Sequence, residues 1–171
     1  MKKLILTLIF LLIFLSGCGF YSLDNFTLPD DREFIALIQE LDTPEKICQY
    51  MLENFTFEPH TFRLTPYQLY VTRKGDCDDF SIFGVFFANR HNYETYQMAI
   101  FYKDIRYNHY LAIYKENNKY NFSDNQSYIF VETTNFREIA DRYNFPLRDV
   151  VWLKYIVYNY DMNIIEQGIN P

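Results

Sequence analysis

The hydrophobic positions between residues 30 and 54 repeat with the period of an α-helix. The first set follows the i, i+3, i+4, i+7 spacing of one helical face: Phe34, Leu37, Ile38 and Leu41. Asp30 or Asp31 can cap this helix at its start. A second helix begins at Thr43-Pro44-Glu45, where a capping hydroxyl precedes a proline at the first helical position. We expect it to reach about Asn54 and to bury Ile47, Cys48, Met51 and Leu52.

A third helix differs from these two because its apolar residues lie on nearly every side. Pro59 and Pro66 first break the chain into a loop and a short helical turn at residues 67–70. The segment from Cys77 to about Asn89 then contains the large apolar residues Phe80, Ile82, Phe83, Val85, Phe86 and Phe87. A helix that is apolar all round is normally buried at the centre of a domain. We therefore expect this helix to form the core.

After Tyr93 the pattern changes to short extended runs rich in aromatic and β-branched residues. We expect strands over residues 95–102, 107–114, 120–122 and 150–158. Glu116-Asn117-Asn118 predicts a hairpin turn between the second and third strands. Asn135 and Glu138 have the spacing of a capping box, which predicts a helix over residues 135–143. Helices first and antiparallel strands afterwards indicate an α+β fold, in a single domain over residues 30–171.

The first fifteen residues have a pattern of their own. Lys2 and Lys3 precede an apolar run over residues 4–15 that only Thr7 interrupts. The run is too short to cross about 30 Å of hydrocarbon as a helix, which needs about 20 residues. It fits the hydrophobic region of a cleavable signal peptide, which we predict over residues 1–17.

The end of this run places a cysteine in a distinctive setting. Leu15-Ser16-Gly17-Cys18 resembles the lipobox of bacterial lipoproteins, in which the cysteine carries lipid. The resemblance implies acyl chains such as palmitate on Cys18 and a tether over residues 18–29. It also implies a protein anchored to an inner or outer envelope membrane, outside the cytoplasm. The alternatives are an ordinary signal peptide that ends near a cysteine, or an uncleaved anchor.

Composition and charge narrow the classes of partner. The 16 tyrosines and 17 phenylalanines are too many for a disordered chain. A formal net charge of −6 with no basic run argues against nucleic acid, and the lack of a glycine-rich phosphate loop argues against a nucleotide. The three histidines are scattered, and the aspartates around Cys77 do not match a calcium-binding EF-hand loop. We therefore predict no metal and no other cofactor.

Cys77, His109 and Asp124 form the candidate catalytic set. Cys77 stands at the predicted start of the buried helix, where unpaired N–H groups and the helix dipole favour a thiolate. His109 lies in the second strand and can take the thiol proton and return it to a leaving amine. Asp124 closes the third strand, so hairpin pairing can bring its carboxylate beside His109 and orient the ring.

Each of the three also has a purely structural interpretation, as an inert buried cysteine, a strand histidine and a turn residue. Cys48 is expected to be a small buried hydrophobe, although the sequence leaves open a disulfide with Cys77. His60 and His91 fall in polar loops, where we expect surface residues, although either could replace His109 as the base.

The segment Gly75-Asp76-Cys77-Asp78-Asp79-Phe80, followed by His109 in one strand and Asp124 at the end of another, resembles the core of transglutaminase-like cysteine peptidases. The resemblance covers about residues 43–130. It implies a papain-like fold, with the cysteine on a central helix packed against an antiparallel sheet that carries the histidine and the acid. It also implies acyl transfer through a thioester, ending in hydrolysis or in transfer to an amine. The tryptophans that the family often has near its histidine and its acid are absent at the corresponding places here.

Two further expectations concern the chemistry around Cys77. An oxyanion needs hydrogen-bond donors, and the backbone N–H of Cys77 is one candidate, with Gln68 or Tyr67 as another. The neighbouring aspartates, Asp76, Asp78 and Asp79, suit a helix N-terminus but oppose thiolate formation by their charge.

The leading hypothesis is therefore an envelope-anchored cysteine hydrolase or acyltransferase that acts on peptide or isopeptide amides of the cell envelope. The alternative is a binding or scaffolding lipoprotein of the same fold that holds a peptide without cutting it.

Overall fold

The computed structural model of the protein describes residues 26–103, 107–144 and 150–171. The predicted signal peptide, Cys18 and most of the predicted tether lie outside the described residues, so their roles stay predictions. Within the ranges that the structure describes, no helix is both long enough and apolar enough to cross a membrane.

Helices dominate the described chain up to residue 90. They are α2 (Arg32–Glu40), α3 (Pro44–Asn54), α4 (Pro66–Thr72) and α5 (Cys77–Arg90). Two short strands, β1 (Thr56–Phe57) and β2 (Lys74–Gly75), pair in parallel beside them. The predicted helices and the predicted helical turn near residue 67 are all confirmed.

The caps of α2 and α3 are the ones that the sequence predicts. The Asp31 carboxylate accepts hydrogen bonds from the backbone N–H groups of Glu33 and Phe34 at 3.0 Å, and the Thr43 hydroxyl accepts one from Lys46 at 3.3 Å. One burial prediction is wrong, because Leu52 is 58% exposed. Leu52 lies about 100° further round α3 than Met51, which takes its side chain off the buried face.

The central helix α5 is buried as predicted. Every residue from Asp79 to Ala88 is buried. Asp76 caps the helix, and a capping box with Asp79 satisfies its first N–H groups. Cys77 is the first residue of this buried helix, and the hydrogen bonds between Asp76 and Asp79 fix its position.

The second half of the described chain forms a six-stranded antiparallel sheet with the order β6-β5-β4-β3-β7-β8. Its strands are β3 (Glu94–Tyr102), β4 (His109–Glu116), β5 (Lys119–Asp124), β6 (Ser127–Thr133), β7 (Trp152–Asn159) and β8 (Ile164–Ile169). Asn117 and Asn118 have φ values of 52° and 62°, as a two-residue hairpin turn requires. The predicted turn is confirmed, whereas β6 and β8 are additions to the predicted strands.

The short helix α6 (Phe136–Asp141) connects β6 to β7 and is capped differently from the prediction. Asn135 accepts from the N–H of Arg137 at 2.8 Å, as a cap should. The Glu138 carboxylate, however, accepts from the Thr133 hydroxyl, and the Asn135 N–H donates to that same hydroxyl at 3.1 Å. The predicted capping box is therefore wrong in its second half, because Thr133 stands between the two groups.

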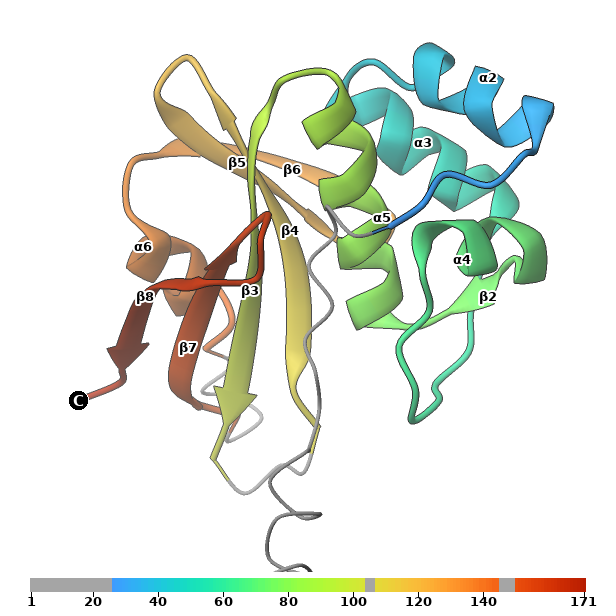
Figure 1. The fold of residues 1–171 in the computed structure, drawn as a ribbon. Helices are drawn as coiled ribbons and strands as arrows, with labels where there is room; N and C mark the ends of the chain where they lie inside the picture. The colour runs from blue at the N-terminus through green and yellow to red at the C-terminus, as the bar shows by residue number, and fades with distance from the viewer. Residues whose placement is uncertain (1–25, 104–106, 145–149) are drawn as a thin grey trace, which may run out of the picture.

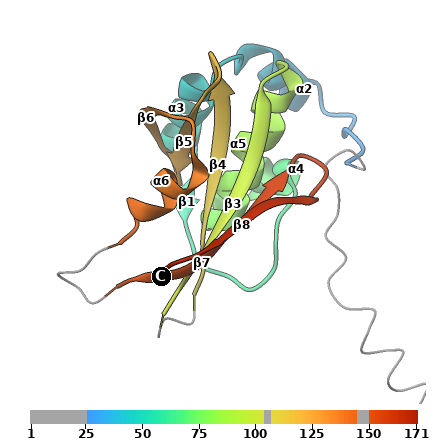
Figure 2. The same ribbon diagram turned by 90° about the vertical axis from the view of Figure 1, so that its left-hand side faces the viewer.

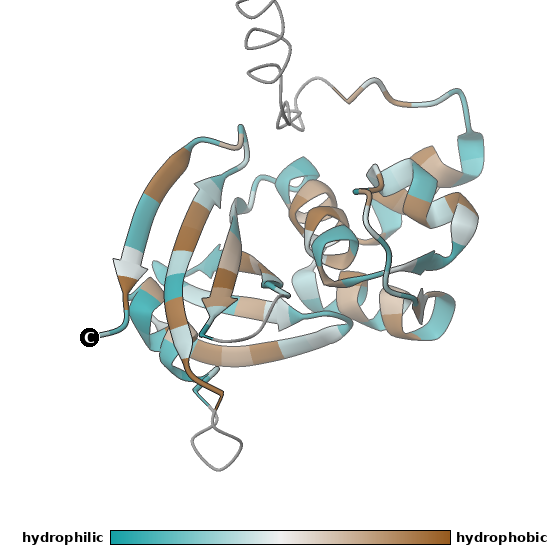
Figure 3. Ribbon diagram, turned by 90° about the horizontal axis from the view of Figure 1, so that it is seen from below, coloured by the Kyte–Doolittle hydropathy of each residue, from teal (hydrophilic) through white to brown (hydrophobic). Residues whose placement is uncertain are grey.

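The layers of the fold place α5 against the sheet and the outer helices against α5 (Figure 1). The sheet is twisted, and β7 and β8 cross obliquely in front of β3 when the sheet is seen from the side opposite α5 (Figure 2). One apolar cluster lies between the sheet and α2–α5, and a second lies on the other face beneath α6. Apolar stretches recur along the strands and along the central helix, between polar ones (Figure 3). The predicted α+β architecture, a buried cysteine-bearing helix packed on an antiparallel sheet, is confirmed.

Candidate active site

The chain just before α5 packs closely against Leu69 and Asp79, at the position of Gly75. A Cβ on Gly75 would lie 2.7 Å from Cδ1 of Leu69 and 2.8 Å from Oδ2 of Asp79. A side chain at this position would have to displace Leu69 or Asp79, so glycine suits the entry into the helix. Cys77 follows as the first helical residue, half-buried and with a free thiol.

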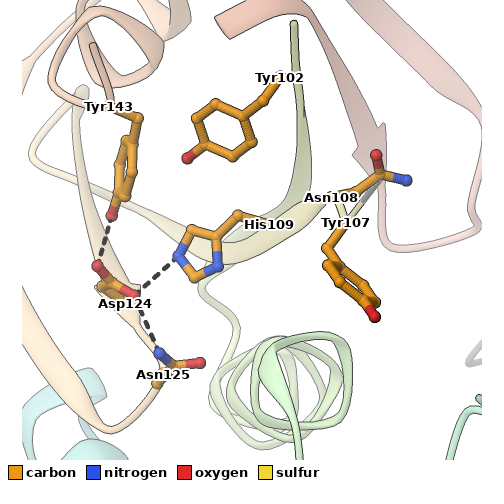
Figure 4. Close-up of a pocket in the computed structure, with 7 residues that line it drawn as sticks. All are labelled: Tyr102, Tyr107, Asn108, His109, Asp124, Asn125 and Tyr143. Carbon is orange, nitrogen blue, oxygen red and sulfur yellow. Dashed lines mark hydrogen bonds and ion pairs between the residues drawn. The ribbon is translucent and has the colours of Figure 1, made fainter. Parts of the chain in front are cut away.

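Strand register brings His109 and Asp124 together. Asp124 of β5 pairs with Leu111 of β4, and His109 lies two residues before Leu111 on the same face. Diagonal neighbours of this kind are within reach of long side chains. Nε2 of His109 lies 2.8 Å from Oδ1 of Asp124 (Figure 4). The hairpin that the sequence predicts is therefore what pairs the imidazole with the carboxylate.

The third member of the set approaches from the helix. Sγ of Cys77 lies 3.8 Å from the carbonyl oxygen of Asn108, the residue directly before His109. The thiol also lies close enough to the His109 side chain to raise the pKa of that imidazole. The structure thus brings together all three candidate catalytic residues, from α5, β4 and β5.

The electrostatics of the pair favour charge separation. Burial disfavours an imidazolium, but the interactions of the ring with Asp124 and Cys77 outweigh it and raise the pKa of His109 to about 9. Burial acts to raise the pKa of Asp124, but the hydrogen bond and the charge of His109 outweigh it and hold that pKa below its usual value. At neutral pH the site therefore contains an imidazolium held by a carboxylate.

A pocket of about 420 Å³ opens beside these residues. It is lined by Tyr102, Tyr107, Asn108, His109, Asp124, Asn125 and Tyr143 (Figure 4). Cys77 adjoins the pocket at Asn108 without lining it. Burial, together with the charges of Asp124 and Cys77, raises the pKa of Tyr102 to about 12, which keeps this hydroxyl protonated in the pocket. The lining combines three tyrosine rings with four polar side chains, so the pocket offers both apolar surface and hydrogen-bonding groups to a ligand.

The aspartates around Cys77 are less negative in effect than the sequence suggests. Asp79 is buried and accepts hydrogen bonds from the N–H groups of Leu64 at 2.7 Å and Asp76 at 3.0 Å. Burial, a hydrogen bond with Asp76 and repulsion from Asp79 raise the pKa of Asp78 to about 7, so this carboxyl is only about half ionised at neutral pH. The acidic cluster therefore anchors a loop and opposes a thiolate less than three full charges would.

His60 and His91 are not simple surface residues, which corrects the sequence-based expectation. Nε2 of His60 lies 2.6 Å from Oδ2 of Asp79, and the attraction of Asp79 and Asp76 raises the pKa of His60 against the effect of burial. This shift favours the imidazolium form, whose charge would offset the aspartates. His91 follows the last residue of α5, and its Nε2 lies 2.6 Å from the carbonyl oxygen of Ile38. Neither contact was predictable from loop composition.

The two side chains considered as oxyanion donors are engaged elsewhere in the structure. The side-chain Oε1 of Gln68 accepts a hydrogen bond from the backbone N–H of Thr65 at 2.8 Å within the cap of α4. The Tyr67 hydroxyl donates to the Asp31 carboxylate at 3.0 Å. Neither lines the pocket. Their oxyanion role stays a prediction, and the Cys77 N–H at the start of α5 is the candidate nearest the thiol.

Cys48 has the structural role that the sequence predicts. It is 2% exposed, it is a free cysteine like Cys77, and burial raises its pKa to about 12. A thiol in that environment is inert.

Comparison with solved structures identifies the fold. LapG of Legionella pneumophila, EGTA-treated, has a TM-score of 0.50 at 13% sequence identity, covering 87% of this chain and 82% of LapG. Calcium-bound LapG gives 0.47 at 13%, covering 78% of each chain. A Cytophaga hutchinsonii protein provisionally described as a cysteine protease gives 0.44 at 11%, covering 85% of this chain and 60% of that one. No protein-family model and no curated protein matches the sequence. The predicted transglutaminase-like, papain-like fold is confirmed.

One cluster of the described residues has the chemistry of possible metal ligands. His60, Asp76 and Asp79 each offer a ligand atom, and these atoms lie within 4.8 Å of one another. All four carboxylate oxygens, however, already accept hydrogen bonds from N–H groups or from His60. Calcium takes six to eight oxygen ligands, and this set includes a nitrogen. The structure assigns no metal to the cluster, and the absence of a metal cofactor stays a prediction.

Proposed function

We propose that the protein is an envelope-anchored cysteine hydrolase or acyltransferase that acts on peptide or isopeptide amides through a thioester. The observation that carries this proposal is the convergence of Cys77, His109 and Asp124 from separate elements at one pocket. An imidazole placed beside both a thiol and a carboxylate is the arrangement that nucleophilic catalysis uses, and a protein that only held a peptide would not need it.

In the first half of the reaction the Cys77 thiolate attacks the carbonyl carbon of an amide in the pocket. The carbonyl oxygen becomes an oxyanion, to which the N–H of Cys77 can donate. The His109 imidazolium then gives its proton to the amide nitrogen, the C–N bond breaks, and the amine leaves. Asp124 holds the ring in place and stabilises its charge, leaving an acyl group on sulfur.

In the second half a water molecule or an amine attacks the thioester carbonyl carbon. His109, now neutral, accepts the proton of the attacking group, and the C–S bond breaks. The product is a carboxylic acid when water attacks and a new amide when an amine attacks. Both outcomes regenerate the Cys77 thiolate beside an imidazolium.

The test is product formation from a library of envelope-derived peptides and isopeptides, analysed by mass spectrometry. Wild-type protein is expected to release an amine fragment and to yield either an acid, which gains one water, or an acyl-transfer product. Cys77→Ala is expected to yield neither, because it lacks the nucleophile. Cys48→Ala is the matched control and should retain full product, since that thiol is buried. Equal products from wild type and Cys77→Ala would overturn the proposal.

Anchoring through Cys18 is a separate part of the proposal and rests on the lipobox-like segment Leu15-Ser16-Gly17-Cys18. Cells grown with labelled palmitate are expected to incorporate the label into wild-type protein, which should sediment with the membranes. Cys18→Ser should lose the label and move to the soluble fraction, because more than one acyl chain is needed for stable anchoring. Label retained in Cys18→Ser would place the lipid elsewhere and contradict the assignment.

A further inference from the structure

Tyr143 is the aromatic residue that joins the end of α6 to the candidate site. Its backbone N–H donates to the carbonyl oxygen of Ala140 at 2.9 Å, which fixes it just beyond the helix. The side chain is 7% exposed and packs against the rings of Phe122 and His109, with centroid distances of 6.2 and 5.3 Å. Its hydroxyl points away from this packing and toward Asp124 (Figure 4).

The hydroxyl of Tyr143 forms its hydrogen bond with the Asp124 carboxylate oxygen that His109 does not contact. It donates to Oδ2 of Asp124 at 2.9 Å, while His109 lies against Oδ1 at 2.8 Å. The Asn125 amide donates to the same Oδ1 at 3.3 Å. With both oxygens engaged from different directions, the carboxylate cannot turn about its bond to Cβ without losing a hydrogen bond.

Packing alone does not account for this arrangement. A phenylalanine would fill the same space beneath α6, because the ring of Tyr143 already makes the apolar contacts. What the tyrosine adds is an O–H donor to an ionised group, and hydrogen bonds to charged groups are the stronger kind. Burial and the negative charge of Asp124 raise the pKa of Tyr143 well above its usual value, so the hydroxyl remains a donor.

We propose that Tyr143 is a positioning residue that fixes the Asp124 carboxylate in the orientation that supports His109. The proposal rests on the proposed function in naming the reaction that it serves. It extends the set of Cys77, His109 and Asp124 by a fourth residue, which lies just after α6. Tyr143 acts through Asp124 and His109 on the thiol.

The test compares full-length wild type and Tyr143→Phe, purified in detergent. The Asp124 carboxyl signal is assigned in ¹³C NMR by its loss in Asp124→Asn, and its pKa is expected to rise by about one unit in Tyr143→Phe. Iodoacetamide alkylation of Cys77 is measured at pH 6 and at pH 10. The rate at pH 6 divided by the rate at pH 10 is expected to be about fivefold lower in Tyr143→Phe than in wild type. The reason is that a misoriented carboxylate supports the imidazolium, and thus the thiolate, less well.

Tyr155→Phe is the matched control. Tyr155 is also buried, and its hydroxyl donates to the Glu166 carboxylate at 2.7 Å, outside the set of residues that line the pocket. This variant should leave both measurements unchanged while showing the general effect of losing such a hydrogen bond on thermal stability. A rate ratio in Tyr143→Phe equal to that in Tyr155→Phe overturns the proposal. A changed ratio in a protein that cleaves no peptide would instead overturn the proposed function alone.

Discussion

Replacing Asp124 with asparagine is expected to lower the pKa of His109 from about 9 to below its ordinary value of about 6.5. Burial is the largest influence on this imidazole and acts to lower its pKa, so loss of the carboxylate leaves burial unopposed except for Cys77. Peptide cleavage should slow by about 10²- to 10⁴-fold, as expected when a catalytic histidine loses its orienting acid. The pKa is measured by NMR of the imidazole, and the rate by product formation.

Asp124→Asn should also destabilise the folded protein, by an amount that depends on pH because folding raises the pKa of His109. A histidine whose pKa is raised by folding stabilises the folded state fully below its unfolded pKa, and this contribution is lost as the pH rises through about 9. The Asp124 carboxylate must also be ionised, so the destabilisation of Asp124→Asn should be greatest between about pH 4 and pH 6.5 and should narrow above about pH 9 and at more acidic pH. Asp141→Asn is a suitable control, because Asp141 accepts from the Trp152 indole at 3.2 Å and does not line the pocket. A His109 pKa that stays near 9 in Asp124→Asn would show that the carboxylate does not govern the base.

Gly84→Ala is expected to destabilise the protein by about 2 kcal/mol, despite the helix propensity of alanine. A Cβ at this position would lie 2.4 Å from the Tyr114 hydroxyl and 3.1 Å from Cβ of Ala112. Overpacking a core costs about 1–3 kcal/mol, and displacing Tyr114 weakens its 2.9 Å hydrogen bond to Ser123, worth about 1 kcal/mol. Alanine recovers only about 1 kcal/mol of helix propensity. The net loss should appear as a lower urea midpoint and a lower melting temperature.

A double substitution identifies the cause of that loss. Tyr114→Phe removes the oxygen that the new Cβ would meet, so Gly84→Ala combined with Tyr114→Phe should be more stable than the two separate losses predict. Additive losses would show that helix packing elsewhere, rather than contact with Tyr114, limits this position. Gly84 lies about two turns beyond Cys77, so the same displacement should also slow any reaction of that thiol.

Local patterns along the chain predicted much of the fold, because its helices are set by short-range rules. Asp31, Thr43 and Asp76 cap helices in the structure as capping preferences require. The all-round apolar pattern of α5 correctly predicted its burial. Strand β8 was missed for a matching reason, because its residues are mostly exposed and show no alternation of apolar and polar positions.

The candidate site was predictable only as far as its residues carry local signals. Cys77 stands out by its helix N-terminus, and His109 and Asp124 by the hairpin between them. Tyr143 carries no such signal, because only the return of α6 onto the sheet brings it to Asp124. His60 was misjudged for the same reason, since its partner Asp79 is distant in sequence and α4 and β2 lie between them. Long-range contacts of this kind depend on packing, which one sequence does not reveal.

The origin of the three candidate catalytic residues in two layers has a consequence for the timing of reactivity. His109 and Asp124 meet within one hairpin, which can form early because its contacts are local. Cys77 joins them only when α5 docks on the finished sheet, which requires contacts between distant parts of the chain. On the export proposed above, an extended chain in transit across a membrane would have a thiol but no base beside it. Folding would then itself be the activation step, and the nucleophile would be assembled only where the protein comes to rest.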